Sequence, residues 1–214
     1  MPEAEVERVE APTPAPDVVR AGHGVLEAGG LLVHPTSTVY GLGGGSVDAD
    51  AEVARLKGRP ADEPFLRIAW GVQALRRERP DLRWTPDAER LARRFWPGPL
   101  TLILDDGTDR GLGVRVEAHP VTRAVLRRWG GSVSSTSLNR SGDPAAITPS
   151  EVRMTLDALP RPRLPTVWLD AGALPGGPPS TLLSLRHPTP RLLRSGAVDP
   201  GAIEEALDRE VARG

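Results

Sequence analysis

From Asp17 onward, the chain alternates short apolar segments with segments of helical character, and this alternation limits the folds that it can adopt. Strand-like runs lie at residues 31–33, 65–70, 100–104, 113–116, 166–169, 181–185 and 191–193. Helical segments lie around and between them at 18–28, 49–56, 86–95, 120–129, from 148, and at 199–211. The alternation is irregular and shows no internal repeat. The sequence therefore predicts an α/β domain with a twisted mixed sheet flanked by helices.

Several helix ends carry recognisable stop and start signals. Thr148-Pro149-Ser150-Glu151 is a capping box with proline at the first helical position. Thr85 is placed to cap the helix that begins at Pro86. Gly58 suits the end of the 49–56 helix, which places Lys57 at a helix C-terminus, where the local dipole favours a cation.

Residues 1–16 differ in composition from the rest of the chain. They are acidic and then rich in proline and alanine, and they carry few apolar groups. We therefore expect a disordered acidic tail over 1–16 and one domain over 17–214. No apolar run approaches membrane-spanning length, and the start is acidic rather than signal-like. The chain also has no cysteine, so we expect a cytoplasmic protein without a membrane contact.

Lys57 is the one lysine among 27 basic residues. It lies in Lys57-Gly58-Arg59-Pro60, so a compact ammonium and a planar guanidinium stand two residues apart, a pairing that suits polyphosphate. The alternative is a solvated helix end in which a lysine survives by chance. The four histidines show no metal-ligand spacing, so no protein-bound metal is expected.

Two further segments are rich in hydroxyl groups and glycine. Residues 35–43 follow a strand directly, and residues 134–142 run Ser-Ser-Thr-Ser-Leu-Asn-Arg-Ser-Gly. Such groups at a strand end are placed for ligand contact in α/β sheets. Ordinary turn chemistry and a plain serine-rich loop are the alternatives. Ser180-Thr181 at a strand start and Arg194 at a strand end are weaker signals of the same kind.

Taken together and in order, these segments resemble the threonylcarbamoyl-adenylate synthase family, the YrdC-like domain. Seven motifs over roughly residues 17–210 carry the resemblance: 35–42, 57–60, 96–101, 114–116, 135–142, 180–181 and 194–196. The resemblance implies a concave ligand cleft. It also implies that the protein forms threonylcarbamoyl-AMP and pyrophosphate from L-threonine, bicarbonate and ATP, for modification of a tRNA adenosine by downstream transferase proteins.

The resemblance also implies residue roles. Lys57 and Arg59 would clamp the phosphates and act in catalysis, and Ser137, Asn139 and Arg194 would complete the ATP site. The threonine site would consist of Thr36, Arg115, Ser135 and Ser180. Mg²⁺ would enter with ATP, without protein ligands.

Three positions depart from the family pattern in ways that affect the site. Members often carry a histidine in the strand over 65–70, where Ile68 and its neighbours supply none. Leu138 replaces the usual alanine, which would put a bulkier group beside the nucleotide, and Ser184 stands where an acid is common. A fourth change, Glu117 in place of a proline after Val114-Arg115-Val116, is minor.

Two other functions stay open. The first is an RNA-binding module that holds tRNA on an arginine-lined face without catalysis, although Trp, Phe and Tyr total only 4% of the residues. The second is a nucleotide-binding relative that lost turnover through the changes at Ile68, Leu138 and Ser184.

Overall fold

The computed structural model describes residues 4–60, 63–140 and 142–213. The strands are β1 (Val6–Glu10), β2 (Leu31–Pro35), β3 (Tyr40–Gly44), β4 (Leu66–Ala69), β5 (Leu100–Leu104), β6 (Leu112–Val116), β7 (Ser132–Ser137), β8 (Thr166–Asp170), β9 (Thr181–Ser184), β10 (Arg191–Arg194) and β11 (Ala212–Arg213). The helices are α1 (Pro16–Glu27), α2 (Val47–Lys57), α3 (Val72–Glu78), α4 (Pro86–Phe95), α5 (Pro120–Trp129), α6 (Pro149–Ala158) and α7 (Pro200–Leu207).

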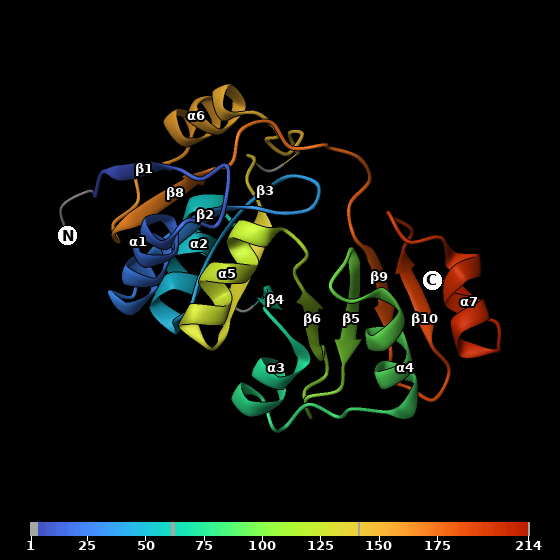
Figure 1. The fold of residues 1–214 in the computed structure, drawn as a ribbon. Helices are drawn as coiled ribbons and strands as arrows, with labels where there is room; N and C mark the ends of the chain where they lie inside the picture. Colours follow the sequence, from blue (N-terminus) through green and yellow to red (C-terminus); the bar gives the residue numbers. More distant parts are fainter. Residues whose placement is uncertain (1–3, 61–62, 141, 214) are drawn as a thin grey trace.

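All described strands join one mixed sheet in the order β1-β8-β2-β3-β7-β4-β6-β5-β9-β10-β11. The sheet contains parallel pairs such as β4 with β6 and antiparallel pairs such as β2 with β3 and β5 with β6. Strand β7 pairs with β3 on one side and β4 on the other, so it joins the two halves of the sheet (Figure 1). The predicted α/β class with a twisted mixed sheet is confirmed.

The two halves of the sheet are covered differently. In the first half, α1 and α5 pack on one face around Leu32 and Val133, while α2 and α6 pack on the other around Leu31 and Val33. In the second half, α3, α4 and α7 share a core with β5, β6 and β9 (Figure 1). The alternation along a strand then decides which residues face away from these helices.

Strand β6 shows this alternation. Leu112, Val114 and Val116 point into the core beneath α3 and α4, so Gly113 and Arg115 face the opposite side. Thr101 and Ile103 alternate in the same way with the core leucines of β5. The uncovered face of the second half of the sheet thus receives the polar side chains that form the pocket described below.

The expectation that residues 1–16 form a disordered tail is wrong for residues 4–16, while residues 1–3 lie outside the described part of the chain. Residues 6–10 form β1, which pairs in parallel with β8, and Ala11 is fully buried. Arg8 donates two hydrogen bonds to Asp170 and lies 5.1 Å from the ring centre of Trp168. A partner strand more than 150 residues away supplies the contacts that the local composition lacks. The domain therefore begins well before residue 17.

Other elements also differ from the expectation. Strands β3, β7 and β11 and helix α3 were not expected as such, and the last helix ends at Leu207 rather than continuing to 211. The predicted caps are confirmed. Thr148 and Glu151 form a complete capping box, the Thr85 side chain accepts from the Ala88 N–H, and Gly58 ends α2 with φ 61°.

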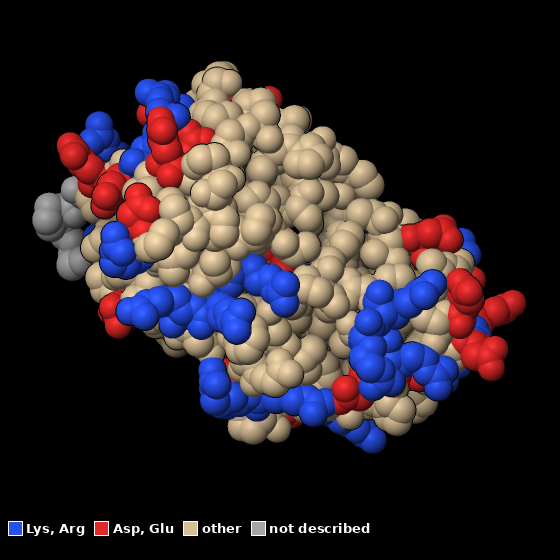
Figure 2. Space-filling view, in the orientation of Figure 1, with Lys and Arg blue, Asp and Glu red and all other residues tan. Residues whose placement is uncertain are grey.

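Arginine pairs occupy the last turns of three helices, Arg76-Arg77 in α3, Arg93-Arg94 in α4 and Arg127-Arg128 in α5. Figure 2 shows basic side chains gathered over these helices. Cations at helix C-termini are stabilised by the helix dipole, so a structural cause accounts for their placement. Among the described residues, no helix has the length and apolar character that crossing a membrane requires.

Candidate active site

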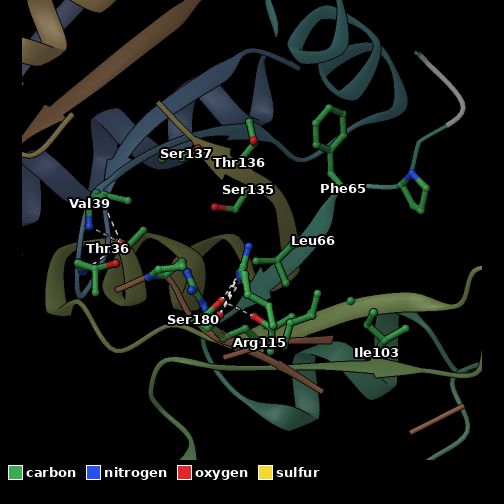
Figure 3. Close-up of a pocket in the computed structure, with 18 of the residues that line it drawn as sticks. Thr36, Val39, Phe65, Leu66, Ile103, Arg115, Ser135, Thr136, Ser137 and Ser180 are labelled. Carbon is green, nitrogen blue, oxygen red and sulfur yellow. Dashed lines mark hydrogen bonds between the residues drawn. The ribbon is translucent and has the colours of Figure 1, made fainter. Parts of the chain in front are cut away.

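A pocket of about 430 Å³ lies on the uncovered face of the sheet, where the two halves meet. Residues from β3, β4, β5, β6, β7 and β9, the loop before β3 and the end of β10 line it. Seven of the nine predicted site residues are among them: Thr36, Arg59, Arg115, Ser135, Ser137, Ser180 and Arg194. Figure 3 shows that Thr36, Ser135, Ser137, Arg115 and Ser180 surround a common space. The described lining includes four arginines and no carboxylate, so the pocket favours an anionic ligand.

The loop between β2 and β3 forms one wall, and Thr36 organises it. The Thr36 hydroxyl donates to the Val39 carbonyl oxygen at 2.7 Å and accepts from the backbone N–H groups of Thr38 and Val39. The Thr36 N–H also donates to the Val39 carbonyl oxygen. Thr36 therefore shapes a tight turn in addition to lining the pocket, as short hydroxyl side chains do in turns.

Strand β7 supplies the hydroxyl groups of the next wall. Ser135 is buried, and its Oγ lies 3.4 Å from Nε2 of His34, a side chain that is fully buried behind the pocket. Burial lowers the pKa of His34 to about 4, although the nearby Glu117 carboxylate opposes this shift. His34 is therefore neutral near pH 7 and can exchange a hydrogen bond with Ser135 without adding charge.

Arg115 approaches the pocket from β6 and is paired with a buried carboxylate. Its Nη2 donates to Oε2 of Glu117 at 2.7 Å, and Glu117 is fully buried directly after β6. Burial alone raises the pKa of Glu117, but Arg115 and the backbone N–H of His119 outweigh it and leave this pKa below its ordinary value. The Nε of Arg115 is buried without a hydrogen-bond partner, while the residue itself lines the pocket.

Arg194 lies beside Arg115 and is fixed by Ser180. It donates to the Ser180 carbonyl oxygen through Nε and Nη2 and to the Ser180 hydroxyl at 3.2 Å. Ser180 also shares a 2.9 Å hydrogen bond with the hydroxyl of Thr101. Burial and the charge of Arg115 lower the pKa of Arg194. The effect of Arg115 reflects electrostatic repulsion between two guanidinium groups that face one small space. An anion placed between them would relieve this repulsion.

Lys57 and Asn139 are the other two predicted residues. They lie behind the wall formed by β7 and do not line the pocket. The Lys57 Nζ donates to the carbonyl oxygens of Ser137 and Asn139 and to Oδ1 of Asn139. Asn139 Oδ1 also accepts from the Ser137 hydroxyl. Burial, followed by the charge of Arg59, lowers the pKa of Lys57 to about 8. The ammonium thus holds the end of β7 in shape, directly beneath a pocket serine.

Arg59 lines the pocket from the segment after α2. It pairs with Glu63 at 2.6 Å and lies 5.1 Å from the ring centre of Phe65, which also lines the pocket. Sequence reasoning missed Thr101, Phe65 and Arg110 as lining residues. The alternation along β5 could have indicated Thr101, because the leucines on either side of it are core residues, whereas no local signal marked the other two.

The three departures from the family pattern lie away from the pocket wall. Ile68 is fully buried in the core beneath α1 and α5, while Leu66, two residues earlier, lines the pocket. The expectation that Leu138 places bulk beside the nucleotide is wrong, because its side chain is fully buried in the core beneath α2. Ser184 ends β9 opposite Arg191 and faces a separate groove.

The fold and the pocket together define an α/β protein with an arginine-rich binding site for an anionic small molecule, built at the junction of two half-sheets. A family model for Sua5, YciO and YrdC proteins, described as "Telomere recombination", matches residues 24–196. The chain belongs to this family.

Individual relatives agree with this assignment. A Mycobacterium tuberculosis protein is 35% identical over 204 residues, which cover 88% of each chain. A Pyrococcus abyssi protein named threonylcarbamoyl-AMP synthase is 32% identical over 88% of this chain and 57% of its own length. The crystal structure of P. abyssi Sua5 complexed with L-threonine superposes with a TM-score of 0.82 at 26% identity, covering 99% of this chain and 63% of that one.

Proposed function

We propose that this protein is an enzyme, an L-threonylcarbamoyladenylate synthase. It would condense L-threonine, bicarbonate and ATP into threonylcarbamoyl-AMP and pyrophosphate, which makes it a nucleotidyltransferase. The observation that carries the proposal is the convergence of seven predicted residues, from separate segments, on one pocket of about 430 Å³. The relatives named for this activity, and the threonine complex of one of them, support the same substrate.

The reaction requires little covalent chemistry from the protein. The amine of threonine adds to the carbon of CO₂ or bicarbonate and gives a carbamate, with loss of a proton or of water. A carbamate oxygen then attacks the α-phosphorus of ATP, and the bond to the β-phosphate oxygen breaks to release pyrophosphate. Negative charge develops on the phosphoryl oxygens and on the leaving group, so fixed cations supply the main stabilisation.

The residues of the pocket divide into those that would bind threonine and those that would bind ATP. Arg115 would bind the threonine carboxylate with its guanidinium, while Thr36, Ser135 and Ser180 hold the amino acid around it. Arg59 and Arg194 would contact the nucleotide phosphates. Lys57 and Asn139 would act from behind the wall, holding Ser137 in place and adding positive charge beneath the phosphates.

The side chains that line the pocket indicate how Mg²⁺ would be held there. Mg²⁺ is bound by carboxylates and phosphate oxygens, and the described lining contains no Asp or Glu. The described residues also include no cluster of three or more His, Cys, Asp or Glu side chains that could hold a metal ion. We therefore propose that Mg²⁺ reaches this site on the phosphates of ATP and supplies charge neutralisation there.

The product would be consumed elsewhere. Threonylcarbamoyl-AMP is a reactive mixed anhydride, so transferase proteins that modify a tRNA adenosine would take it up, and both steps would occur in the cytoplasm. Direct tRNA contact by this chain is not needed for its own reaction.

Pyrophosphate release tests this proposal. We expect release that requires ATP, L-threonine and bicarbonate together, with L-serine as a weaker substrate. Release that ignores threonine would indicate a different nucleotide reaction. No release, combined with ATP binding measured by calorimetry, would identify a relative that has lost turnover. RNA binding without ATP binding would identify the RNA-binding module.

A further inference from the structure

Glu117 is the only fully buried acidic side chain among the described residues, and the proposed mechanism gives it no role. It directly follows β6 and lies behind the pocket, among groups from three other segments. The charged or titratable side chains near it are Arg115 on β6, His34 on β2 and His119 at the start of α5. A buried carboxylate is costly unless its oxygen atoms are satisfied, so its contacts indicate what it is for.

The two oxygen atoms of Glu117 have different partners. Oε1 accepts from the backbone N–H groups of Ser37, Ala118 and His119 at 3.1, 2.9 and 3.0 Å. Oε2 accepts from Nη2 of Arg115 at 2.7 Å. The Glu117 carboxylate therefore connects the turn after β6 and the loop between β2 and β3 to the Arg115 guanidinium.

This arrangement couples two walls of the pocket. Ser37 lies next to Thr36, whose hydroxyl shapes the loop, and Arg115 lines the same pocket from β6. Ser37 and Glu117 are 80 residues apart in sequence, so the contact is tertiary rather than a feature of one turn. Figure 3 shows Thr36 and Arg115 facing the same space, which a shift of either wall would widen or narrow.

We propose that Glu117 is a positioning residue, which holds Arg115 and the Ser37 loop at a fixed separation and so sets the recognition of the amino-acid carboxylate. This inference rests on the proposed function for the identity of the substrate. The geometry gives Arg115 one neutralising partner, Glu117, while Arg115 itself lines the pocket. The carboxylate fixes the rotamer of Arg115 before the substrate arrives, which lowers the entropy that binding has to overcome.

Glu117→Gln separates the two functions of the carboxylate. The amide oxygen can still accept from the three backbone N–H groups, but the amide NH₂ group then meets Nη2 of Arg115, donor against donor. The reverse orientation sets the NH₂ group against three donors and is less favourable. Glu117→Gln therefore keeps the hydrogen bond from the Ser37 N–H and loses the one from Arg115.

Glu52→Gln is the matched control. Glu52 is a buried carboxylate on α2 that also accepts from one guanidinium, that of Arg55, and from one backbone N–H, that of Arg163. It does not line the pocket. Both variants lose a buried ion pair of similar kind, so both should lose stability, but only the change at residue 117 should alter substrate recognition.

In pyrophosphate release assays, Glu117→Gln should raise the KM for L-threonine about 10-fold and leave the KM for ATP within about twofold. The preference for L-threonine over L-threoninamide, which lacks the carboxylate, should fall by a similar factor. Glu52→Gln should change neither value. Equal effects on both substrates, or an unchanged threonine KM in a folded variant, would overturn the positioning role.

A second measurement does not depend on the substrate. Hydrogen exchange of the Ser37 amide in the free protein should accelerate at least about 10-fold in Glu117→Ala and stay unchanged in Glu52→Gln. Unchanged exchange in Glu117→Ala would overturn the coupling of the two walls. If the parent protein neither binds threonine nor releases pyrophosphate, the proposed function fails, and the exchange result still decides whether Glu117 couples the loop to β6.

Discussion

The Nζ atom of Lys57 lies 2.9 Å from the carbonyl oxygen of Ser137 and also contacts the backbone and side-chain oxygens of Asn139. Three acceptors thus match the three donors of one ammonium group. A guanidinium is planar and wider, so it cannot meet three converging acceptors in this way. This explains on structural grounds why a chain that otherwise uses arginine for its basic residues has a lysine here.

Replacement of this lysine is the first test. Lys57→Arg should lower turnover at least ~10-fold, which corresponds to about 1.4 kcal/mol of transition-state stabilisation, because the bulkier group displaces Ser137. Arg55→Lys, at a half-buried position of the same helix that does not line the pocket, is the control and should keep its turnover. Pyrophosphate release and thermal unfolding are measured on both. Normal turnover in Lys57→Arg would show that the lysine is not required.

The lowered pKa of Lys57 gives a pH dependence whose sign can be stated. Lys57 has a pKa of about 8 in the folded protein against an ordinary value of 10.5, so its charge is lost as the pH rises through 8. We expect kcat/KM for ATP to fall above pH 8, because the cation beneath the phosphates disappears.

Stability should change in the opposite direction over the same range. The unfolded chain binds more protons than the folded one between pH 8 and 10.5, so this residue makes the free energy of unfolding rise with pH. Denaturant titrations at pH 7.5 and 9 measure this contribution, with Lys57→Met as the variant that should lack it. Loss of activity that follows loss of stability would contradict the assignment.

Arg115→Ala addresses the amino-acid end of the pocket. Removing the guanidinium should weaken threonine binding by roughly 1.5–3 kcal/mol, because a charge-assisted pair is lost, and should leave ATP binding near its parent value. Calorimetry with each ligand checks this. A collapse of ATP affinity with unchanged threonine affinity would reverse the two subsites. Arg115→Ala should also lower the free energy of unfolding, since it leaves the buried Glu117 carboxylate without its cationic partner.

Deletion of residues 1–10 tests the first strand. We expect the free energy of unfolding to fall by about 1–3 kcal/mol, because β8 loses a neighbour and the buried Asp170 loses Arg8. The pocket lies on other strands, so turnover at low temperature should persist. Urea unfolding of the deletion variant and of Arg8→Ala separates the loss of the strand from the loss of the ion pair. Unchanged stability would restore the view of this segment as an unpacked tail.

The elements that could be predicted from the sequence are those with strong local signals. Apolar strands such as β5 and capped helices such as α4 and α6 follow directly from residue patterns. The order of motifs also indicated seven residues of one pocket. The missed strands β3 and β7 consist largely of glycine, serine and threonine, and β1 is mostly charged. In these strands pairing with distant partners overrides weak local propensity.

The roles of Glu117 and His34 were hidden for a related reason. A glutamate after a strand and a histidine within one carry no local sign that they will be buried side by side. Only the topology, which sets β2 and the end of β6 behind one pocket, brings them together. Leu138 is an error in the other direction. Its place in the serine loop suggested a ligand contact, but its side chain packs in the core.

The close approach of β3 to β7 provides the last prediction. A Cβ atom at Gly43 would lie 1.7 Å from the carbonyl oxygen of Ser134, which is backbone and cannot move aside alone. Gly43→Ala should therefore force the two strands apart and cost at least about 3 kcal/mol of stability. Gly24→Ala is the control, because Gly24 lies in α1 with open space around its Cα and should gain about 0.5–1 kcal/mol.

Gly43→Ala should also alter the pocket. Gly41 and Leu42 pair with Ser137 and Thr136, so displacement of β3 moves the hydroxyl groups that line one wall. In whatever fraction of Gly43→Ala remains folded at low temperature, the KM values for ATP and threonine should both rise, in contrast to the threonine-specific effect expected at Glu117. Urea unfolding and pyrophosphate release, measured on the same preparations, check both effects. A Gly43→Ala protein with parent stability would mean that β3 and β7 do not lie this close.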